Sequence, residues 1–222
     1  MSYLSEKNEW LWAKMQGKWL DEFINKEAWK KINDYNFKEN NEWTIYDYEQ
    51  SPLCQIIWGE ILTDLFNDEF KRSGEKYTYL INRTALTIKN KKESYRFLFD
   101  VMNNLKAKWS PDSNDNEYHF IGNFTPIPAN NPKNKRSLQF IHRDFNENWN
   151  DMIVYFKKNW KDFEMNNLTF EKYIEFTYQC DYYCNDEFKV TNDIEEIRLK
   201  IDNRGRKIQN KCSEIFSNKK TK

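Results

Sequence analysis

Histidine is almost absent from this chain, whose 222 residues include only two, His119 and His142. Glycine and proline are also scarce, at 5 residues each, which is too few for a protein dominated by tight β turns. No stretch approaches the ~20 apolar residues of a membrane-spanning helix. The N-terminal MSYLSEKNEWLWAKMQ also lacks the apolar core of a secretory signal. These absences predict a cytoplasmic protein with no membrane partner.

The four cysteines are dispersed: Cys54, Cys180, Cys184 and Cys212. A disulfide framework is therefore not expected in a chain of this size without a signal peptide. On a helix, Cys180 and Cys184 at i and i+4 could in principle hold one metal ion. No further Cys or His follows at ligand spacing, so two core thiols are the favoured interpretation. We expect no metal site and no cofactor.

Neither sign of charge is in excess, because 35 Lys and Arg balance 35 Asp and Glu. Overall charge therefore gives no support to nucleic-acid binding, although a local basic face remains open. The C-terminal region carries one candidate face: Arg198, Arg204, Lys207, Lys211, Lys219, Lys220 and Lys222. Such a face is usually only solvated, and the alternative is that it binds RNA.

Aromatic residues are abundant, with 9 Trp, 13 Tyr and 16 Phe making up 17% of the chain. Side chains of this size can form a sizeable core. The mean hydropathy of −1.00 therefore does not indicate disorder.

Apolar residues recur at helical spacing in six segments: 5–34, 51–70, 93–109, 144–163, 168–184 and 192–216. Ser51 and Pro52 form a favourable helix start, and Thr169 is a favourable cap. Segments 43–50 and 78–88 are ambiguous, and β-branched residues in the second favour a short strand. We therefore predict a mainly α fold. It is a single-domain helical bundle over residues 1–216, with one or two short strands and a flexible basic tail at 217–222.

The stretch YHFIGNFTPIPANNPKNKRSLQFIH, residues 118–142, contains both histidines and three of the prolines. Proline disfavours helix at the preceding residue, so an extended loop is expected through Pro126 and Pro128. It is either an active-site loop that enters a helix or a structural connector stiffened by proline.

Arg136 and His142 form an R-x5-H pattern at the end of this stretch. Six steps of ~100° would leave the two side chains about 120° apart on a helix, which a long Arg tolerates. An imidazole can move the proton of a ribose 2′-hydroxyl, and Arg can hold the scissile phosphate without a metal. Further phosphate contacts could come from nearby residues: His119, Lys133, Lys135 and Arg143. The structural alternative is that Arg136 pairs with a carboxylate such as Asp144 while His142 packs or caps.

The R-x5-H pattern resembles the motif of the HEPN ribonucleases, a family of toxins and phage-defence proteins. The resemblance covers Arg136 and His142 only. It implies a metal-independent endoribonuclease in which two copies of the chain face one cleft.

A second resemblance rests on two segments, GNFTPIP and the C-terminal IDNRGRKI. Together they are similar to the later part of HNH-type nuclease domains and to bacterial proteins with an IGNF-x-x-IP segment. The matching positions are Gly122, Asn123, Arg204 and Ile208. The upstream His of the HNH motif is missing, because residues 1–117 contain no histidine.

The sequence leaves two functions open. The first hypothesis is an endoribonuclease of the bacterial toxin or antiviral-defence type that uses Arg136 and His142 on RNA. The alternative is a non-catalytic module that binds a protein or a nucleic acid through surface aromatics and the GNFTPIP loop.

Glu60 and Asp64 would also share a helix face and could bind a cation, although paired acids on exposed faces are common.

Overall fold

The computed structural model describes seven segments of the chain: residues 52–70, 76–82, 85–102, 121–129, 149–163, 167–189 and 193–220. It also describes eight single residues, at positions 18, 20, 21, 24, 25, 30, 165 and 191. Five of these single residues, at positions 18, 20, 21, 24 and 25, are helical, in line with the helix predicted over 5–34.

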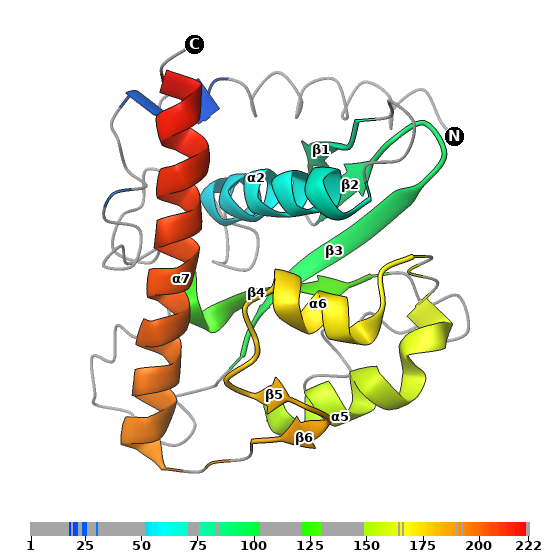
Figure 1. The fold of residues 1–222 in the computed structure, drawn as a ribbon, viewed down its shortest axis with the longest axis vertical. Helices are drawn as coiled ribbons and strands as arrows, with labels where there is room; N and C mark the ends of the chain where they lie inside the picture. The colour runs from blue at the N-terminus through cyan, green and yellow to red at the C-terminus, as the bar shows by residue number, and fades with distance from the viewer. Residues whose placement is uncertain are drawn as a thin grey trace.

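A four-stranded antiparallel sheet lies at the centre of the described structure (Figure 1). Its strands follow the chain in the order β1 (Thr78–Ile81), β2 (Leu86–Lys89), β3 (Ser94–Val101) and β4 (Phe124–Pro128). A separate two-stranded hairpin joins β5 (Tyr183–Cys184) to β6 (Glu187–Phe188). The prediction of a mainly α helical bundle is therefore wrong, since helices and a substantial sheet share the fold.

Strand β3 is the main reason for that error. Its residues were expected to form a helix over 93–109, because Tyr95 and Leu98 have helical spacing. The same segment also alternates, and Tyr95, Phe97 and Phe99 are all buried on one face. Pairing with β2 on one side and β4 on the other satisfies the backbone, which a pattern in one segment cannot reveal.

Strand β4 shows why the prolines of FTPIP are compatible with a sheet. Ala129 N donates to Arg96 O at 2.8 Å, and Met102 N donates to Asn123 O at 2.7 Å. In the antiparallel register these bonded pairs alternate with unbonded ones, and Pro126 and Pro128 fall on the unbonded positions. The expected extended conformation is confirmed here, but as a buried edge strand rather than a loop.

Helix α2 (Pro52–Glu69) crosses β1 and β2, as Figure 1 shows. Its predicted start at Pro52 and its end near Phe70 are confirmed. Phe66 packs edge-on against Tyr95, with ring centroids 4.8 Å apart. A Cβ added to Gly59 would lie 2.4 Å from the Tyr79 ring, so glycine permits this close approach of helix and sheet.

Helix α7 (Ile194–Lys220) runs along one side of the molecule and packs against α2 and the short helix η4 (Ile121–Asn123). The predicted apolar stripe is confirmed, since Ile197, Ile201 and Ile208 are all buried. The helix continues through Lys220 and thus includes four residues of the segment expected to be a tail.

The remaining elements form the lower part of Figure 1: α5 (Trp149–Asn159), the short helix η5 (Trp160–Phe163) and α6 (Phe170–Phe176). Thr169 caps α6 as predicted, and its side chain accepts a hydrogen bond from Lys172 N at 3.2 Å. Helix α6 ends before Cys180, which is exposed, and Cys184 lies in β5. The expectation that both cysteines share a helix is therefore wrong.

The start of α5 is tied to the sheet by buried polar groups. Trp149 Nε1 donates to Gln179 Oε1 at 2.9 Å. Gln179 Nε2 donates in turn to Thr125 Oγ1 at 3.1 Å and to Thr177 Oγ1 at 2.6 Å. Buried amides left without partners are costly, so this network selects one placement of α5.

Within the described segments, no helix has the length and apolar character needed to cross a membrane.

Candidate functional site

The residues predicted to form a ribonuclease site all lie outside the described segments: His119, Lys133, Lys135, Arg136, His142 and Arg143. Helix α5, the helix that this stretch was expected to enter, is described from Trp149 onward. The site therefore stays a prediction from the sequence.

Two of the positions shared with the HNH-like pattern, Gly122 and Arg204, meet in the structure. Arg204 of α7 is fully buried, and its Nη1 donates to the carbonyl oxygens of Gly122 and Phe124, each at 2.7 Å. Its Nε donates to Thr177 O at 3.0 Å. The guanidinium carbon lies 5.2 Å from the centroid of the Trp58 ring, within cation–π range. Burial lowers the pKa of Arg204 to about 10, so the group stays charged at neutral pH.

Gly122 explains how η4 and α7 approach so closely. A Cβ at Gly122 would lie 2.0 Å from Ile201 O, which is a backbone atom that cannot rotate away. Glycine and arginine therefore act together to join η4 and β4 to α7. This geometry favours the structural interpretation of the GNFTPIP segment, because Arg204 donates to protein carbonyls and not into a cleft.

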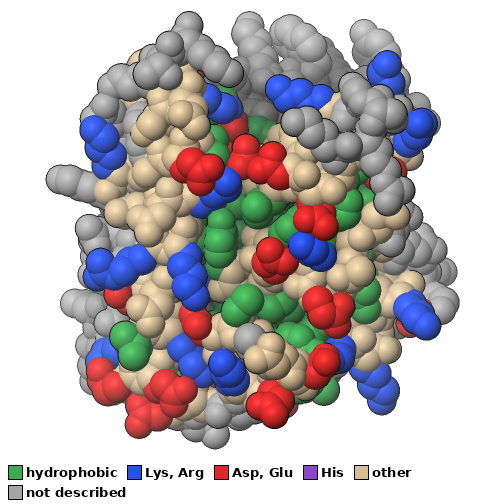
Figure 2. All heavy atoms as spheres, in the orientation of Figure 1, with side chains coloured by type: hydrophobic (Ala, Val, Ile, Leu, Met, Phe, Trp, Pro, Cys, Tyr) green, Lys and Arg blue, Asp and Glu red, His purple; other side chains and the backbone are tan. Residues whose placement is uncertain are grey.

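The described cations of the proposed basic face are buried or paired with acids, and the side chains of Lys220 and Lys222 lie outside the described residues. Arg204 is buried, contrary to its expected place on a solvated face. Arg198 pairs with Glu195 at 2.8 Å, and Lys207 pairs with Asp181 at 3.0 Å. In Figure 2, acidic and basic side chains intermingle over the described part of this face.

Glu60 and Asp64 on α2 are paired with lysines of α7. Lys219 bonds to Glu60, which also accepts from Tyr79 OH at 2.9 Å. Lys211 pairs with Asp64 at 2.7 Å. These ion pairs fasten the two helices together and take up the carboxylates considered for a cation site. Among the described residues, no group of three or more His, Cys, Asp or Glu side chains is placed to hold a metal ion.

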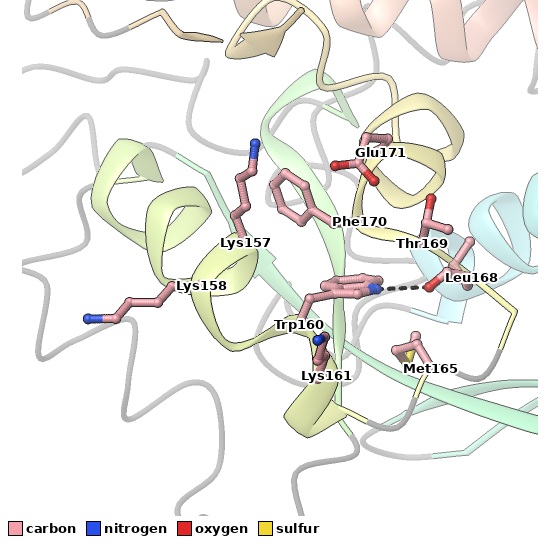
Figure 3. Close-up of a pocket in the computed structure, with 9 residues that line it drawn as sticks. All are labelled: Lys157, Lys158, Trp160, Lys161, Met165, Leu168, Thr169, Phe170 and Glu171. Atoms are coloured by element: carbon pink, nitrogen blue, oxygen red, sulfur yellow. Dashed lines mark hydrogen bonds between the residues drawn. The ribbon is translucent and has the colours of Figure 1, made fainter. Parts of the chain in front are cut away.

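A cleft of about 780 Å³ opens beside the end of α5 (Figure 3). Its walls come from α5, η5, the segment before α6 and the first turn of α6. The lining residues are Lys157, Lys158, Trp160, Lys161, Met165, Leu168, Thr169, Phe170 and Glu171. The volume is within the range of small-molecule sites, roughly 300–1,000 Å³. We call it the lysine–aromatic cleft.

Trp160 lies at the centre of this cleft and is held in place. Its Nε1 donates to Leu168 O at 2.8 Å, the dashed line of Figure 3. Tyr173 packs against it with ring centroids 5.0 Å apart, and Phe170 meets it edge-on at 5.6 Å. The indole N–H is thus already used, and the half-exposed part of the ring offers a fixed apolar surface to a ligand.

Lys157 is anchored by the β5–β6 hairpin. Its Nζ donates to Tyr183 OH and to Asp186 Oδ1, the latter at 2.8 Å. The hydrogen bond that Lys157 donates to Asp186, followed by the one it donates to Tyr183, raises the pKa of Lys157. Asn185 and Asp186 form the hairpin turn with φ of 53° and 64°, the left-handed region expected for a tight two-residue turn. The turn therefore presents Asp186 to the lysine.

Three other charged side chains of the cleft have no ionic partner among the described residues. Lys158 and Lys161 are exposed cations, and Glu171 is an exposed acid on α6. In Figure 3, Lys157 and Lys158 lie on one side of the Trp160 and Phe170 rings, and Glu171 lies on the other. The cleft thus has a cationic side, an aromatic middle and an acidic side.

This arrangement of side chains is suited to binding a ligand. Lysines and a fixed aromatic ring suit an anion that carries a flat ring. A structural role also accounts for two of the lysines, since Lys157 and Lys158 in the last turn of α5 complement the dipole of that helix. The sequence contained one signal, the run KKNWK at 157–161, but its helical spacing assigned Trp160 to the core.

No family model, curated protein or solved structure matches the chain.

Proposed function

We propose that this protein binds single-stranded RNA through the lysine–aromatic cleft. The observation that carries the proposal is a pair of cations, Lys158 and Lys161, which have no ionic partner in the described part of the chain and precede and follow the fixed Trp160 in sequence. Single-stranded nucleic acids bind to grooves of this type, where cations hold phosphates and bases stack on aromatic rings. RNA as the partner and a cytoplasmic location are parts of the same proposal.

The expected contribution of the two lysines to RNA affinity follows from counterion release. Each phosphate contact on a single strand contributes about −0.7 to the slope of log K against log salt, so two lysines contribute about −1.4. At ~0.1 M salt this corresponds to roughly a 25-fold gain in affinity over the same contacts made in 1 M salt. Stacking on one ring adds about 1–3 kcal/mol per base.

The test measures the binding of a labelled single-stranded RNA of about nine nucleotides by fluorescence anisotropy at several salt concentrations. Lys158→Ala with Lys161→Ala is expected to weaken binding about 25-fold at ~0.1 M salt and to make the salt slope shallower by about 1.4. The matched control is Arg206→Ala with Lys207→Ala, which removes the same charge from exposed positions on α7. Equal losses in the two double variants would reject the cleft as the site.

Endoribonuclease activity of the toxin or phage-defence type is the second candidate function, and it rests on Arg136 and His142. In this proposal Arg136 holds the scissile phosphate and His142 moves the proton of the 2′-hydroxyl, with the motifs of two chains facing one cleft. The test is cleavage of total RNA and tRNA in EDTA by the wild type, Arg136→Ala and His142→Ala. Cleavage that persists in EDTA and disappears in both folded variants supports it; equal cleavage by all three proteins rejects it.

A further inference from the structure

Glu171 is the feature of the cleft that phosphate binding leaves unexplained. It lines the cleft together with three lysines, yet it makes no ion pair or hydrogen bond with any described residue. Lys157 is already bound to Asp186, and Figure 3 places Glu171 across the aromatic rings from Lys157 and Lys158. An unpaired carboxylate would repel a phosphate. A ligand that fills the cleft must therefore present hydrogen-bond donors to this side.

The donors available on a nucleotide differ from base to base. The Watson–Crick edge of guanine carries two adjacent donors, N1–H and the N2 amino group. Each of the other bases presents only one donor group there. A carboxylate has two oxygens that accept two parallel hydrogen bonds, the geometry it also uses with arginine. The acid therefore matches guanine better than the other bases.

We infer that the cleft selects guanine, with the base lying against Trp160, its Watson–Crick edge on Glu171 and its phosphate towards the lysines. This inference rests on the proposed function, because it concerns the same RNA at the same cleft. The arrangement of Figure 3 matches it, since the rings of Trp160 and Phe170 separate the lysine side from the glutamate side. Glu171 is then a specificity-determining residue.

A helix-dipole role is the competing explanation for Glu171. An acid in the first turn of α6 stabilises the helix through its dipole whatever ligand binds. That role predicts a change in stability and none in base preference. The comparison of guanine with inosine separates the two explanations, because inosine lacks only the N2 amino group.

The experiment uses the full chain and four RNAs of about nine nucleotides, all uridine except for guanosine, inosine, adenosine or uridine at the centre. A good bidentate contact discriminates by about 1–3 kcal/mol, and loss of one of its two bonds in an exposed cleft gives about a fivefold preference for guanosine over inosine. Glu171→Gln is expected to bind the two RNAs equally, because an amide cannot accept both hydrogen bonds. Glu175→Gln removes the same charge from an exposed position further along α6, and it should keep the preference.

Two results would overturn the inference while the proposed function stands. One is RNA binding by the wild type without a preference for guanosine over inosine. The other is a preference that survives in Glu171→Gln, which would assign the acid to α6 stability or to a ribose hydroxyl. If none of the four RNAs binds, the proposed function itself fails and the guanine inference fails with it.

Discussion

The close contact between Gly122 and α7 predicts that Gly122→Ala will unfold much more easily than the wild type. The new methyl group would lie 2.0 Å from Ile201 O, 2.9 Å from Ile201 C and 3.0 Å from Gly205 N. All three are backbone atoms, so no side-chain rotation can relieve the overlap. Either η4 or α7 must move.

The expected magnitude has two parts. Overpacking of a well-packed interior costs about 1–3 kcal/mol. A shift of η4 also lengthens the bonds from Arg204 to Gly122 O and Phe124 O, and a hydrogen bond from a charged group is worth about 1.5–3 kcal/mol. Partial relaxation makes the sum about 3–5 kcal/mol, or a fall in Tm of roughly 6–20 °C for a chain of this length.

Urea unfolding followed by tryptophan fluorescence measures this loss. Asn203→Ala is the matched control, because Asn203 is exposed on α7 beside Arg204 and its replacement should change stability by less than about 0.5 kcal/mol. If Gly122→Ala lost no more than about 1 kcal/mol, below the range for overpacking, the close approach of η4 and α7 would be refuted.

Two further predictions concern buried titratable groups. Burial raises the pKa of Tyr95 to about 12, above its unfolded value of about 10, so its contribution to stability is complete below pH ~10 and is lost as the pH rises further. The urea midpoint should therefore fall between about pH 10 and pH 12, the interval between the unfolded pKa of tyrosine and the folded pKa of Tyr95. A midpoint that held or rose over this interval would contradict the prediction. Burial also raises the pKa of the thiols of Cys54 and Cys212, whereas Cys180 is exposed. A thiol reagent should modify Cys180 in the native protein and the two buried cysteines only in urea, as peptide mass mapping would show; native labelling of Cys54 would disprove the packing.

Helices α6 and α7 were predictable from signals within their own segments. The stripe of Ile197, Ile201 and Ile208 identified α7 without any knowledge of its neighbours, and Thr169 marked the start of α6. These signals are local, so they survive in the sequence. The lengths of the helices were harder to predict, because the end of a helix depends on hydrogen bonds to residues outside its apolar pattern. Helix α6, for example, ends before Cys180.

The sheet was not predictable in the same way. Strand β3 lies between β2 and β4, and the partner residues that bond to it come from both directions along the chain. Its aromatic residues fit a helical period and a strand period in part, so only pairing with distant residues decides between the two. The extended conformation of β4 was suggested by its prolines, whereas its pairing as a buried edge strand was not, because a loop was expected there.

The same difference between local and long-range signals applies to the functional residues. The sequence singled out Gly122 and Arg204, but only the fold shows that the guanidinium binds backbone carbonyls. Lys158 and Trp160 were visible as part of a helical segment, while Glu171 comes from the next helix. A cleft assembled from two segments has no signature in either one.

The pattern of charge pairing narrows the surface on which function should be sought. Among the described side chains of α7, cations that looked free in the sequence are occupied, since Lys207 and Lys211 form ion pairs and Arg204 is buried. Such pairs make a basic helix face a poor ligand for phosphate, because an incoming anion must displace a carboxylate. Lys158 and Lys161 need no such displacement, and in sequence they precede and follow Trp160, whose only polar side-chain atom is already bonded. Within the described structure, the lysine–aromatic cleft is therefore a better candidate for the proposed RNA binding than the face of α7, for which solvation was the favoured interpretation and RNA binding the alternative.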